Sequence, residues 1–481
     1  MARLRRDRTA LAFLALAVAG VLLLAGVLVA VLLPRGNNEA APTTSTEQTQ
    51  SQTQTPTQPG TTSTPPATTA PAPAPVPLPS GPLSVVSVGP FAATVEWSGP
   101  DAPAHVGYGL PELGPTLWAP LRGGRAELTG LRFGTGYRVW AGNAAVDLTT
   151  TPAPDSPTAG VAGGAVQLDG QPFFPLLVIA QCGENFDAGL QAGVTVFIEN
   201  GCGGIAPQSS ALAGRALSLT SAEEAGIGGP GVIGWYYPDE PDLKGISGDG
   251  LPHFPTLAET GRLRVLTLSN HFYSRTDALP AGRGVYPGLV APSDLVGFDL
   301  YPLQESCKAD WLPDVAAAQR EVRTLAGDRP TFQWIEARTW QCHQPDLVVT
   351  PATVRAESWL AVAGGARGLG FFPADWPPDV APGVATVSRE TAALGPALLA
   401  PDEPVSVTPP VVAGARSFGG AFYVFAVNPT HQSVHATIRA EGLLGDSAVV
   451  VGENRSVEIS GGAIVDDFGP LAVHLYVVPP A

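Results

Sequence analysis

Charged residues are scarce in this sequence, and basic residues are scarcer than acidic ones. Only 14% of the 481 residues are charged, with 26 Lys and Arg against 42 Asp and Glu, so the formal net charge is −16 at pH 7. A nucleic-acid-binding protein needs a basic face, so this balance excludes that class. Cysteine is also rare. Four cysteines are too few for a disulfide scaffold but suit two structural bridges.

Sequence motifs for several common chemistries are missing. The chain has no GxxxxGK[ST] phosphate loop, no glycine-rich dinucleotide fingerprint at a strand–helix turn and no GxSxG nucleophile elbow. Its seven histidines form no HxH or HExxH pair, which argues against a metallohydrolase. The sequence therefore indicates no metal and no cofactor.

The N-terminus combines four arginines with a long apolar run, Leu11–Leu33. As a helix, this run would be about 30 Å long, enough to cross a bilayer. Residues 1–36 are therefore predicted to be a transmembrane signal anchor, with a cytoplasmic N-terminus and the folded domains outside the cell. A cleaved signal peptide is the alternative. Residues 37–81 are rich in Pro and Thr and are expected to form a disordered linker.

Residues 82–152 alternate short apolar strands with Gly and Pro, which predicts an antiparallel β-domain. The predicted strands are Leu83–Val88, Ala93–Trp97, Ala104–Tyr108 and Arg138–Ala141. Trp97 and the pattern Leu131-x-x-x-Thr135-x-Tyr137 resemble a fibronectin type III sandwich, which implies that the Trp fills the core and the Tyr hydroxyl fixes a corner. This domain is expected to be a spacer or a module that binds carbohydrate or a partner.

Residues 160–403 alternate strand-like apolar runs with helical or loop segments, which predicts parallel strands joined by crossovers. Eight runs match the size of a (β/α)8 TIM barrel. They are Phe174–Ala180, Val194–Glu199, Ala216–Leu219, Val232–Tyr236, Arg264–Ser269, Leu295–Asp299, Thr331–Ile335 and Gly368–Phe372. The clearest helix is Pro351–Gly364, with Thr350 as N-cap. Residues 404–481 return to alternating strands and predict a C-terminal antiparallel β-sandwich.

Two glutamates follow predicted barrel strands, and barrel chemistry occurs at the carboxyl ends of strands. Glu240 lies between prolines just after the fourth run, and Glu336 directly follows the seventh. Two carboxyl groups facing one pocket can hydrolyse a glycosidic bond. At about 5–5.5 Å apart one acts as nucleophile, and at about 6.5–9.5 Å a water fits between them.

The same residues resemble the catalytic pair of the retaining glycoside hydrolases of clan A, a superfamily of barrel glycosidases. The segments Val296–Pro302 and Arg355–Leu369 are similar to segments of that group. The resemblance implies that Glu240 is the acid/base and Glu336 the nucleophile. It also places Trp376 at the floor of the sugar site. One departure is Asp239, where the clan usually has a sugar-binding Asn. Its charge is expected to repel Glu240.

Other polar residues near strand ends are candidates for substrate binding. Tyr301 is a candidate hydrogen-bond partner of the nucleophile, and Asp299, His271 and Glu199 are candidates to contact the sugar. Ordinary packing or solvation is the alternative for each of them. Among the three possible cysteine pairings, neighbouring strands favour Cys182–Cys202 and Cys307–Cys342 in an oxidising compartment. A zinc site is the alternative.

Together these patterns predict a multidomain, membrane-anchored extracellular glycoside hydrolase of retaining type. Its predicted substrate is an oligo- or polysaccharide, with cell-wall glycan as one candidate. Its other predicted partner is the membrane, through the N-terminal helix. Two alternatives stay open: a non-catalytic glycan- or cell-wall-binding protein with a degenerate barrel, which Asp239 favours, and a structural adhesion protein. The enzyme hypothesis requires Glu240 and Glu336 to face each other in an open aromatic cleft, with neither carboxyl turned into the barrel wall or toward a helix.

Overall fold

The computed structural model describes residues 82–198 and 202–480, all within the unit Val76–Ala481. The predicted anchor, the linker 37–81 and Glu199 lie outside the described residues. Among the helices of the described ranges, none is long and apolar enough to cross a membrane. The sequence-based localisation of the chain as a single-pass membrane protein is corrected to this extent, that no helix of the described residues supports it.

The first described domain consists of two antiparallel sheets, with strand orders β1-β2-β5 and β4-β3-β6-β7. All four predicted strands are found, and three more were missed. The seven strands are β1 (Leu83–Val88), β2 (Ala92–Trp97), β3 (His105–Gly109), β4 (Leu117–Pro120), β5 (Arg125–Thr129), β6 (Gly136–Ala141) and β7 (Ala144–Thr149). The Tyr137 hydroxyl accepts the Arg132 backbone N–H at 3.0 Å. Trp97, expected to fill the core, is only partly buried and packs against the core.

A small antiparallel sheet that the sequence analysis missed precedes the barrel. Its strands are β8 (Ala159–Ala162), β9 (Ala165–Leu168) and β10 (Gln171–Phe173). Leu168 and Phe173 share one apolar cluster with residues of the barrel strands such as Leu177 and Leu217. Phe91 of the first domain meets Phe173 edge-on, with ring centroids 5.8 Å apart. This cluster therefore connects the first domain to the barrel.

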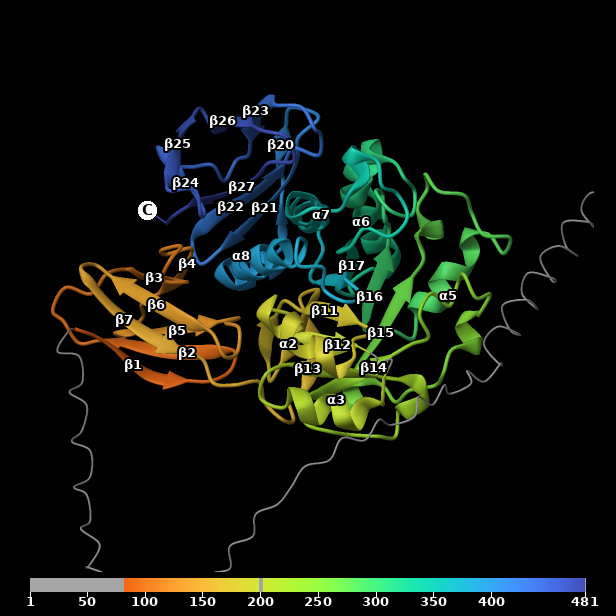
Figure 1. Cartoon of the computed structure of the whole chain (residues 1–481). Coiled ribbons are helices and arrows are strands. Elements are labelled where there is room, and N and C mark those ends of the chain that lie inside the picture. Colours follow the sequence, from red (N-terminus) through yellow and green to blue (C-terminus); the bar gives the residue numbers. More distant parts are fainter. Residues whose placement is uncertain (1–81, 199–201, 481) are drawn as a thin grey trace, which may run out of the picture. The chain divides into compact units, whose positions relative to one another are not determined.

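Eight parallel strands close into the predicted barrel (Figure 1). They are β11 (Leu176–Ile179), β12 (Val196–Ile198), β13 (Leu217–Ser221), β14 (Val232–Tyr236), β15 (Leu263–Leu268), β16 (Leu295–Asp299), β17 (Thr331–Glu336) and β18 (Leu369–Phe372). Each overlaps one predicted run, so the barrel prediction is confirmed. The strands are mainly apolar because both of their faces are buried, although buried polar residues such as Ser218, Thr267 and Gln333 occur among them.

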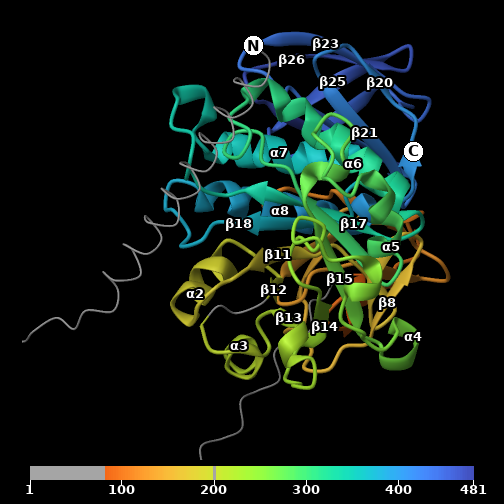
Figure 2. The ribbon, with the colours of Figure 1, turned by 90° about the vertical axis from the view of Figure 1, so that its right-hand side faces the viewer.

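The helices between the strands differ greatly in length. They are α2 (Gly183–Gln191), α3 (Ile205–Leu212), α4 (Leu257–Thr260), α5 (Tyr286–Val290), α6 (Leu312–Ala326), α7 (Pro351–Gly364) and α8 (Ala381–Leu399). Short 3-10 turns add η1 (Ala222–Glu224), η2 (Gly248–Gly250), η3 (Asn270–Phe272), η4 (Arg283–Val285), η5 (Ala309–Trp311) and η6 (Pro345–Leu347). The short α4 lies against β8 (Figure 2). Only α6, α7 and α8 are long, and they cover the side of the barrel that faces the C-terminal domain (Figure 1).

Helix α7 has the predicted boundaries. The Thr350 side chain accepts the Thr353 N–H at 3.2 Å, and Gly365 ends the helix in the left-handed region with φ 101°. At Gly364 a Cβ atom would lie 2.7 Å from the Ala316 carbonyl oxygen of α6. Glycine is required at this position because the two helices approach too closely for a side chain.

The C-terminal domain is an antiparallel sheet of order β19-β21-β22-β27-β24-β25-β26-β23-β20, which fits the predicted sandwich. Its strands are β19 (Asp402–Glu403), β20 (Ser406–Val407), β21 (Val412–Phe418), β22 (Ala421–Val427), β23 (Val434–Arg439), β24 (Ser447–Val450), β25 (Arg455–Ser460), β26 (Ala463–Phe468) and β27 (Val473–Val478). Trp359 of α7 packs on Phe425 of β22 with ring centroids 5.2 Å apart. The sheet therefore buries the outer face of α7.

Candidate active site

A pocket of about 390 Å³ lies at the carboxyl ends of the barrel strands. Three carboxylates and three aromatic rings supply most of its wall. The lining residues are Ile179, Ala180, Asp239, Glu240, Asp299, Tyr301, Trp334 and Phe372. Larger hollows of about 510 and 560 Å³ lie elsewhere, so size does not identify the site. Its position at the strand ends and its acidic, aromatic wall make this pocket the candidate active site.

Glu240 projects into this pocket from the turn after β14. The turn holds Glu240 between Pro238 and Pro241 with φ 44°, a left-handed conformation that is unfavourable for a side chain of this size. Such backbone strain costs on the order of 1–3 kcal/mol and clusters at functional sites. Burial, and after it the negative charge of Asp239, raise the pKa of Glu240 to about 6. The carboxyl group therefore keeps its proton closer to neutral pH than an ordinary glutamate does.

Asp299, the last residue of β16, is in side-chain hydrogen-bond contact with Glu240. Burial and the charge of Glu240 raise the pKa of Asp299 well above its ordinary value. Oxygen Oδ1 of Asp299 has no hydrogen-bond partner among the described residues. Two adjacent carboxylates cannot both ionise easily, so this pair holds one proton between them. The structure thus brings the side chains of Glu240 and Asp299 into contact, whereas the sequence predicts only that both lie at the carboxyl ends of barrel strands.

Asp239 is fixed beside Glu240 by hydrogen bonds. The Tyr236 hydroxyl donates to Asp239 Oδ1 at 2.7 Å, and the Lys244 ammonium donates to the Asp239 backbone carbonyl. The Asp239 carboxylate therefore keeps a defined place in the pocket wall. Its negative charge raises the pKa of Glu240, as the sequence predicts for an Asp in place of an Asn at this position.

Glu336, the expected nucleophile, is not among the pocket-lining residues and is 0% exposed. Its Oε1 accepts the Leu303 backbone N–H at 2.8 Å, and its carboxyl is in hydrogen-bond contact with Glu357 of α7. Burial raises the pKa of Glu336 to about 8, and burial together with Glu336 raises that of Glu357 well above its usual value. The expectation that Glu240 and Glu336 face each other in an open cleft is therefore corrected, because Glu336 turns toward a helix.

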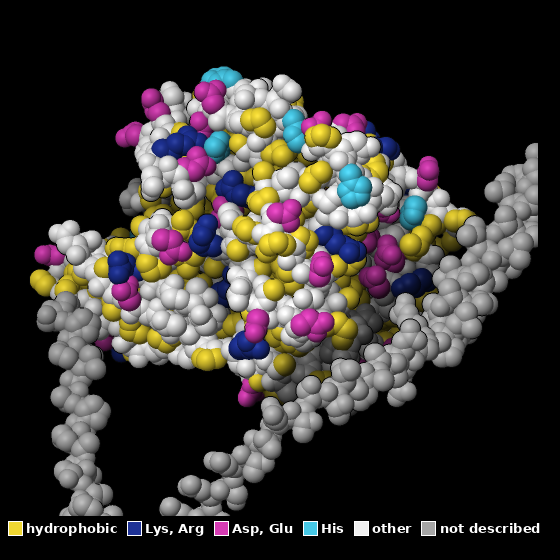
Figure 3. Space-filling view, viewed as in Figure 1, with side chains coloured by type: hydrophobic (Ala, Val, Ile, Leu, Met, Phe, Trp, Pro, Cys, Tyr) yellow, Lys and Arg dark blue, Asp and Glu magenta, His cyan; other side chains and the backbone are white. Residues whose placement is uncertain are grey.

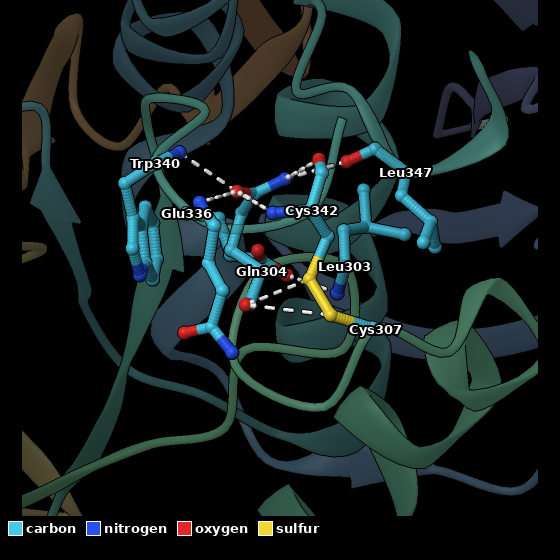
Figure 4. The surroundings of a disulfide bond; sticks show 8 residues. Leu303, Gln304, Cys307, Glu336, Trp340, Cys342 and Leu347 are labelled. Atoms are coloured by element: carbon cyan, nitrogen blue, oxygen red, sulfur yellow. Dashed lines mark hydrogen bonds between the residues drawn. A yellow bond between two sulfur atoms is a disulfide. The ribbon is translucent and has the colours of Figure 1, made fainter. Parts of the chain in front are cut away.

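Gln304 and a disulfide hold the loop beside Glu336 (Figure 4). The fully buried Gln304 side chain accepts the N–H groups of Trp340, Gln341 and Cys342 at 2.7, 2.9 and 3.2 Å. Its amide also donates to the carbonyls of Cys342 and Leu347. These bonds and the Cys307–Cys342 disulfide fix the loop after β16 against the loop after β17. Leu303, which donates to Glu336, is thereby held in place.

Both predicted disulfides are confirmed. Cys182 pairs with Cys202, and Cys307 pairs with Cys342, with Cα–Cα distances of 5.3 and 5.8 Å. Within the described residues no group of three or more His, Cys, Asp or Glu side chains is arranged to hold a metal ion.

The remaining candidates divide between the pocket and its surroundings. Tyr301 lines the pocket, stacked on Phe372 and edge-on to Trp340. Trp376 does not line it. This Trp has φ 54° and is buried against α2, where a Cβ on Gly189 would lie 3.3 Å from its ring. His271 lies outside the lining as well, with Nδ1 2.7 Å from the Asp277 carbonyl oxygen. Neither residue lines this pocket, so the sugar-binding roles expected of Trp376 and His271 stay predictions.

Three residues around the site were missed from the sequence. Phe372 ends β18 and lines the pocket, Glu357 pairs with Glu336, and Gln304 holds the two loops. A signal for Glu357 existed, since it is an acidic residue on a helix whose neighbours are almost all small or apolar. Phe372 closes the eighth predicted run, so its position at a strand end was also visible. Gln304 carries no such signal, because its role depends on how two loops meet.

No protein-family model matches the chain, and no curated protein matches it. Among solved structures, it is similar to a GH30 endoxylanase from Clostridium papyrosolvens C71, with 10% identity over 68% of this chain and 97% of that one and a TM-score of 0.39. It is also similar to a β-glucuronidase from Ruminococcus gnavus, with 10% identity, 64% and 67% coverage and a TM-score of 0.34. A third similar structure is an α-amylase from Geobacillus thermoleovorans, with 9% identity over 63% of this chain and 98% of that one and a TM-score of 0.34. At these values the comparisons carry no argument about activity.

Proposed function

We propose that this protein is a glycoside hydrolase in which Glu240 donates the proton to the departing glycosidic oxygen. One observation carries the proposal: a carboxyl group with a pKa of about 6 stands in an aromatic pocket at the carboxyl end of a barrel. A general acid works best when its pKa is near the working pH, and glycosidases reach this state by burying a carboxyl group next to other carboxylates.

The other wall residues suit a sugar. Tyr301, Trp334 and Phe372 offer apolar surfaces for the face of a sugar ring, and Asp239 and Asp299 offer acceptors for hydroxyl groups. The pocket of about 390 Å³ suits a single sugar unit better than a long chain segment. The substrate would be an oligo- or polysaccharide, bound with one ring in the pocket.

A retaining mechanism needs a second carboxylate at about 5–5.5 Å, and Glu336 is proposed for this role. Burial raises the pKa of Tyr301 well above its usual value, and the charges of Asp299, Asp239, Glu336 and Glu240 raise it as well, which is consistent with a place near both carboxylates. Glu336 is enclosed in this structure, so this role requires its carboxyl group to become accessible when substrate binds. Asp299 is too close to Glu240 to serve instead, since the two carboxyls already share a hydrogen bond.

The enclosure of Glu336 favours one second candidate, a glycan-binding protein without turnover. A carboxyl group that is 0% exposed and paired with another buried acid cannot attack a substrate in this conformation. In that case the pocket would bind a sugar through its aromatic wall and leave the glycosidic bond intact.

The two candidates are separated by assaying the full chain on aryl glycosides and cell-wall polysaccharides, together with Glu240→Gln and Glu336→Gln. The glycosidase proposal expects hydrolysis by the natural protein, loss in both variants and retention of anomeric configuration by NMR. Binding without hydrolysis by all three proteins would support the second candidate. A product with inverted anomeric configuration would refute the assignment of Glu336 as nucleophile but not the glycosidase proposal itself.

We also propose that residues 82–152 form a fibronectin type III-like domain that acts as a spacer. Two features support this proposal: the division of seven strands into sheets of three and four, and the Tyr137 hydroxyl that accepts a backbone N–H five residues upstream. Arg132 also contacts α8 through Ser388 and Thr391, so the domain is tied to the barrel by polar bonds.

A further inference from the structure

A second hollow, of about 510 Å³, lies at the opposite end of the barrel from the candidate active site. Arg329 and Thr331 border it at the start of β17, and Arg367 borders it just before β18. Its outer wall is the turn between β8 and β9, residues 161–164, together with Arg323 near the end of α6. This site shares no residue with the pocket that contains Glu240.

Positive charge in this region exceeds negative charge. Arg323 and Arg416 each make an ion pair of 2.5 Å with the single carboxylate of Asp402, and Arg367 lies 3.7 Å from it. Arg329 binds three backbone carbonyls and no carboxylate among the described residues. The hollow itself is lined by three arginines, Arg323, Arg329 and Arg367, and by one carboxylate, Asp328, while Arg416 and Asp402 lie behind its lining. On the molecular face in Figure 3, acidic and basic side chains are interspersed.

Two of the three arginines around Asp402 are deeply buried. Arg416 is 1% exposed and Arg367 is 6% exposed, so water screens their charges poorly. Burial, and after it the charge of the neighbouring Arg367, lower the pKa of Arg416 to about 9, although Asp402 acts in the opposite direction. One carboxylate therefore does not balance the guanidinium groups around it. Arg416 Nε also has no hydrogen-bond partner within the part of the chain that the structure describes.

We propose that this hollow binds a tetrahedral oxyanion, a phosphate or sulfate group, through Arg323 and Arg367. Guanidinium groups bind such anions through paired, charge-assisted hydrogen bonds. Arg323 is the accessible member of the pair, since its side chain is 36% exposed, whereas Arg367 supplies charge from the buried side. A bound dianion would supply the negative charge that the cluster lacks. The proposal is independent of the glycosidase proposal, because it concerns other residues at the other end of the barrel.

Isothermal titration calorimetry on the full chain at pH 7.5 and constant ionic strength tests this site. The probes are inorganic phosphate, inorganic sulfate and glycerol 3-phosphate. Saturable binding is expected, and Arg323→Gln is expected to weaken it by about tenfold or more. Arg320→Gln is the matched control, because Arg320 lies on the same helix but outside the hollow. Preference for the inorganic ions would indicate a free anion, and preference for glycerol 3-phosphate the end group of a larger molecule.

A second variant keeps the test decisive if Arg323→Gln disturbs the fold through its ion pair with Asp402. Asp328→Asn removes the carboxylate on the rim, which is exposed and not part of that ion pair. It is expected to tighten phosphate binding severalfold, because a like charge is lost. Absence of saturable binding by the natural protein, or equal binding by Asp328→Asn and Arg320→Gln, would overturn the proposal.

Discussion

The carboxyl groups of Glu240 and Asp299 share a hydrogen bond at the carboxyl end of the barrel, although one comes from the turn after β14 and the other from the end of β16. Burial and the charge of Glu240 raise the pKa of Asp299, whereas the hydrogen bond from Asp299 lowers the pKa of Glu240, which burial and the charge of Asp239 raise to about 6. The contact places a proton in the pocket under conditions in which isolated carboxyl groups are ionised. The proposed catalytic role of Glu240 depends on that proton.

The first prediction concerns the pH dependence of hydrolysis. Because Glu240 has a pKa of about 6 and acts when protonated, kcat/KM should fall as the pH rises above about 6. Asp239→Asn removes a negative charge that raises this pKa, so the alkaline limb should move to lower pH by about half a unit to one unit. Asp249→Asn, an exposed position on η2, is the control and should leave the profile unchanged. A profile that Asp239→Asn leaves in place would contradict the electrostatic account.

The second prediction concerns the buried pair of Glu336 and Glu357. Glu336 has its pKa raised from 4.5 to about 8, so the folded state binds more protons than the unfolded state between these values. The stabilising contribution of this pair is present below pH 4.5 and is lost as the pH rises toward 8. Glu357→Gln removes one of the two acids, and its Tm relative to the natural protein should therefore rise between pH 5 and pH 8.

The control for the buried pair is Glu127→Gln, a change at an exposed glutamate of β5. Its Tm difference from the natural protein should be the same at both pH values. A Tm difference for Glu357→Gln that is also independent of pH would show that the two acids do not share a proton.

The third prediction concerns Gln304. Gln304→Leu keeps the volume similar but leaves three N–H groups and two carbonyls without their partner in a buried loop. Each buried polar group without a hydrogen-bond partner costs about 1–3 kcal/mol. Water that enters the loop would satisfy some of these groups, so we expect the free energy of unfolding to fall by about 3–5 kcal/mol in total. Denaturant titration measures it. Gln344→Leu, an exposed position in the same loop, should change stability by less than about 0.5 kcal/mol.

The barrel could be predicted from sequence because its strands are mainly apolar, as strands buried on both faces are, and follow one another at regular intervals. Helix α7 was predictable from Thr350, Pro351 and Gly365, since capping is a local property. Glu240 was placed correctly at a pocket because two flanking prolines restrict its turn. These features depend on residues that are near one another in sequence.

The orientation of the other site residues could not be predicted in this way. Glu336 turns away from the pocket because Glu357, 21 residues further on, and the Leu303 N–H hold its carboxyl. Trp376 is outside the pocket lining, with its ring close to Gly189 of α2. Both outcomes depend on contacts between distant segments, which the pattern of a single strand does not contain.

The most direct test of the central claim compares the natural protein with Glu240→Gln on two aryl glycosides of the same sugar, one with a good and one with a poor leaving group. If Glu240 donates the proton, kcat/KM should fall by about 10²–10⁴ for the poor leaving group and much less for the good one, which needs no protonation. Equal rates for the two proteins on both substrates would contradict the account.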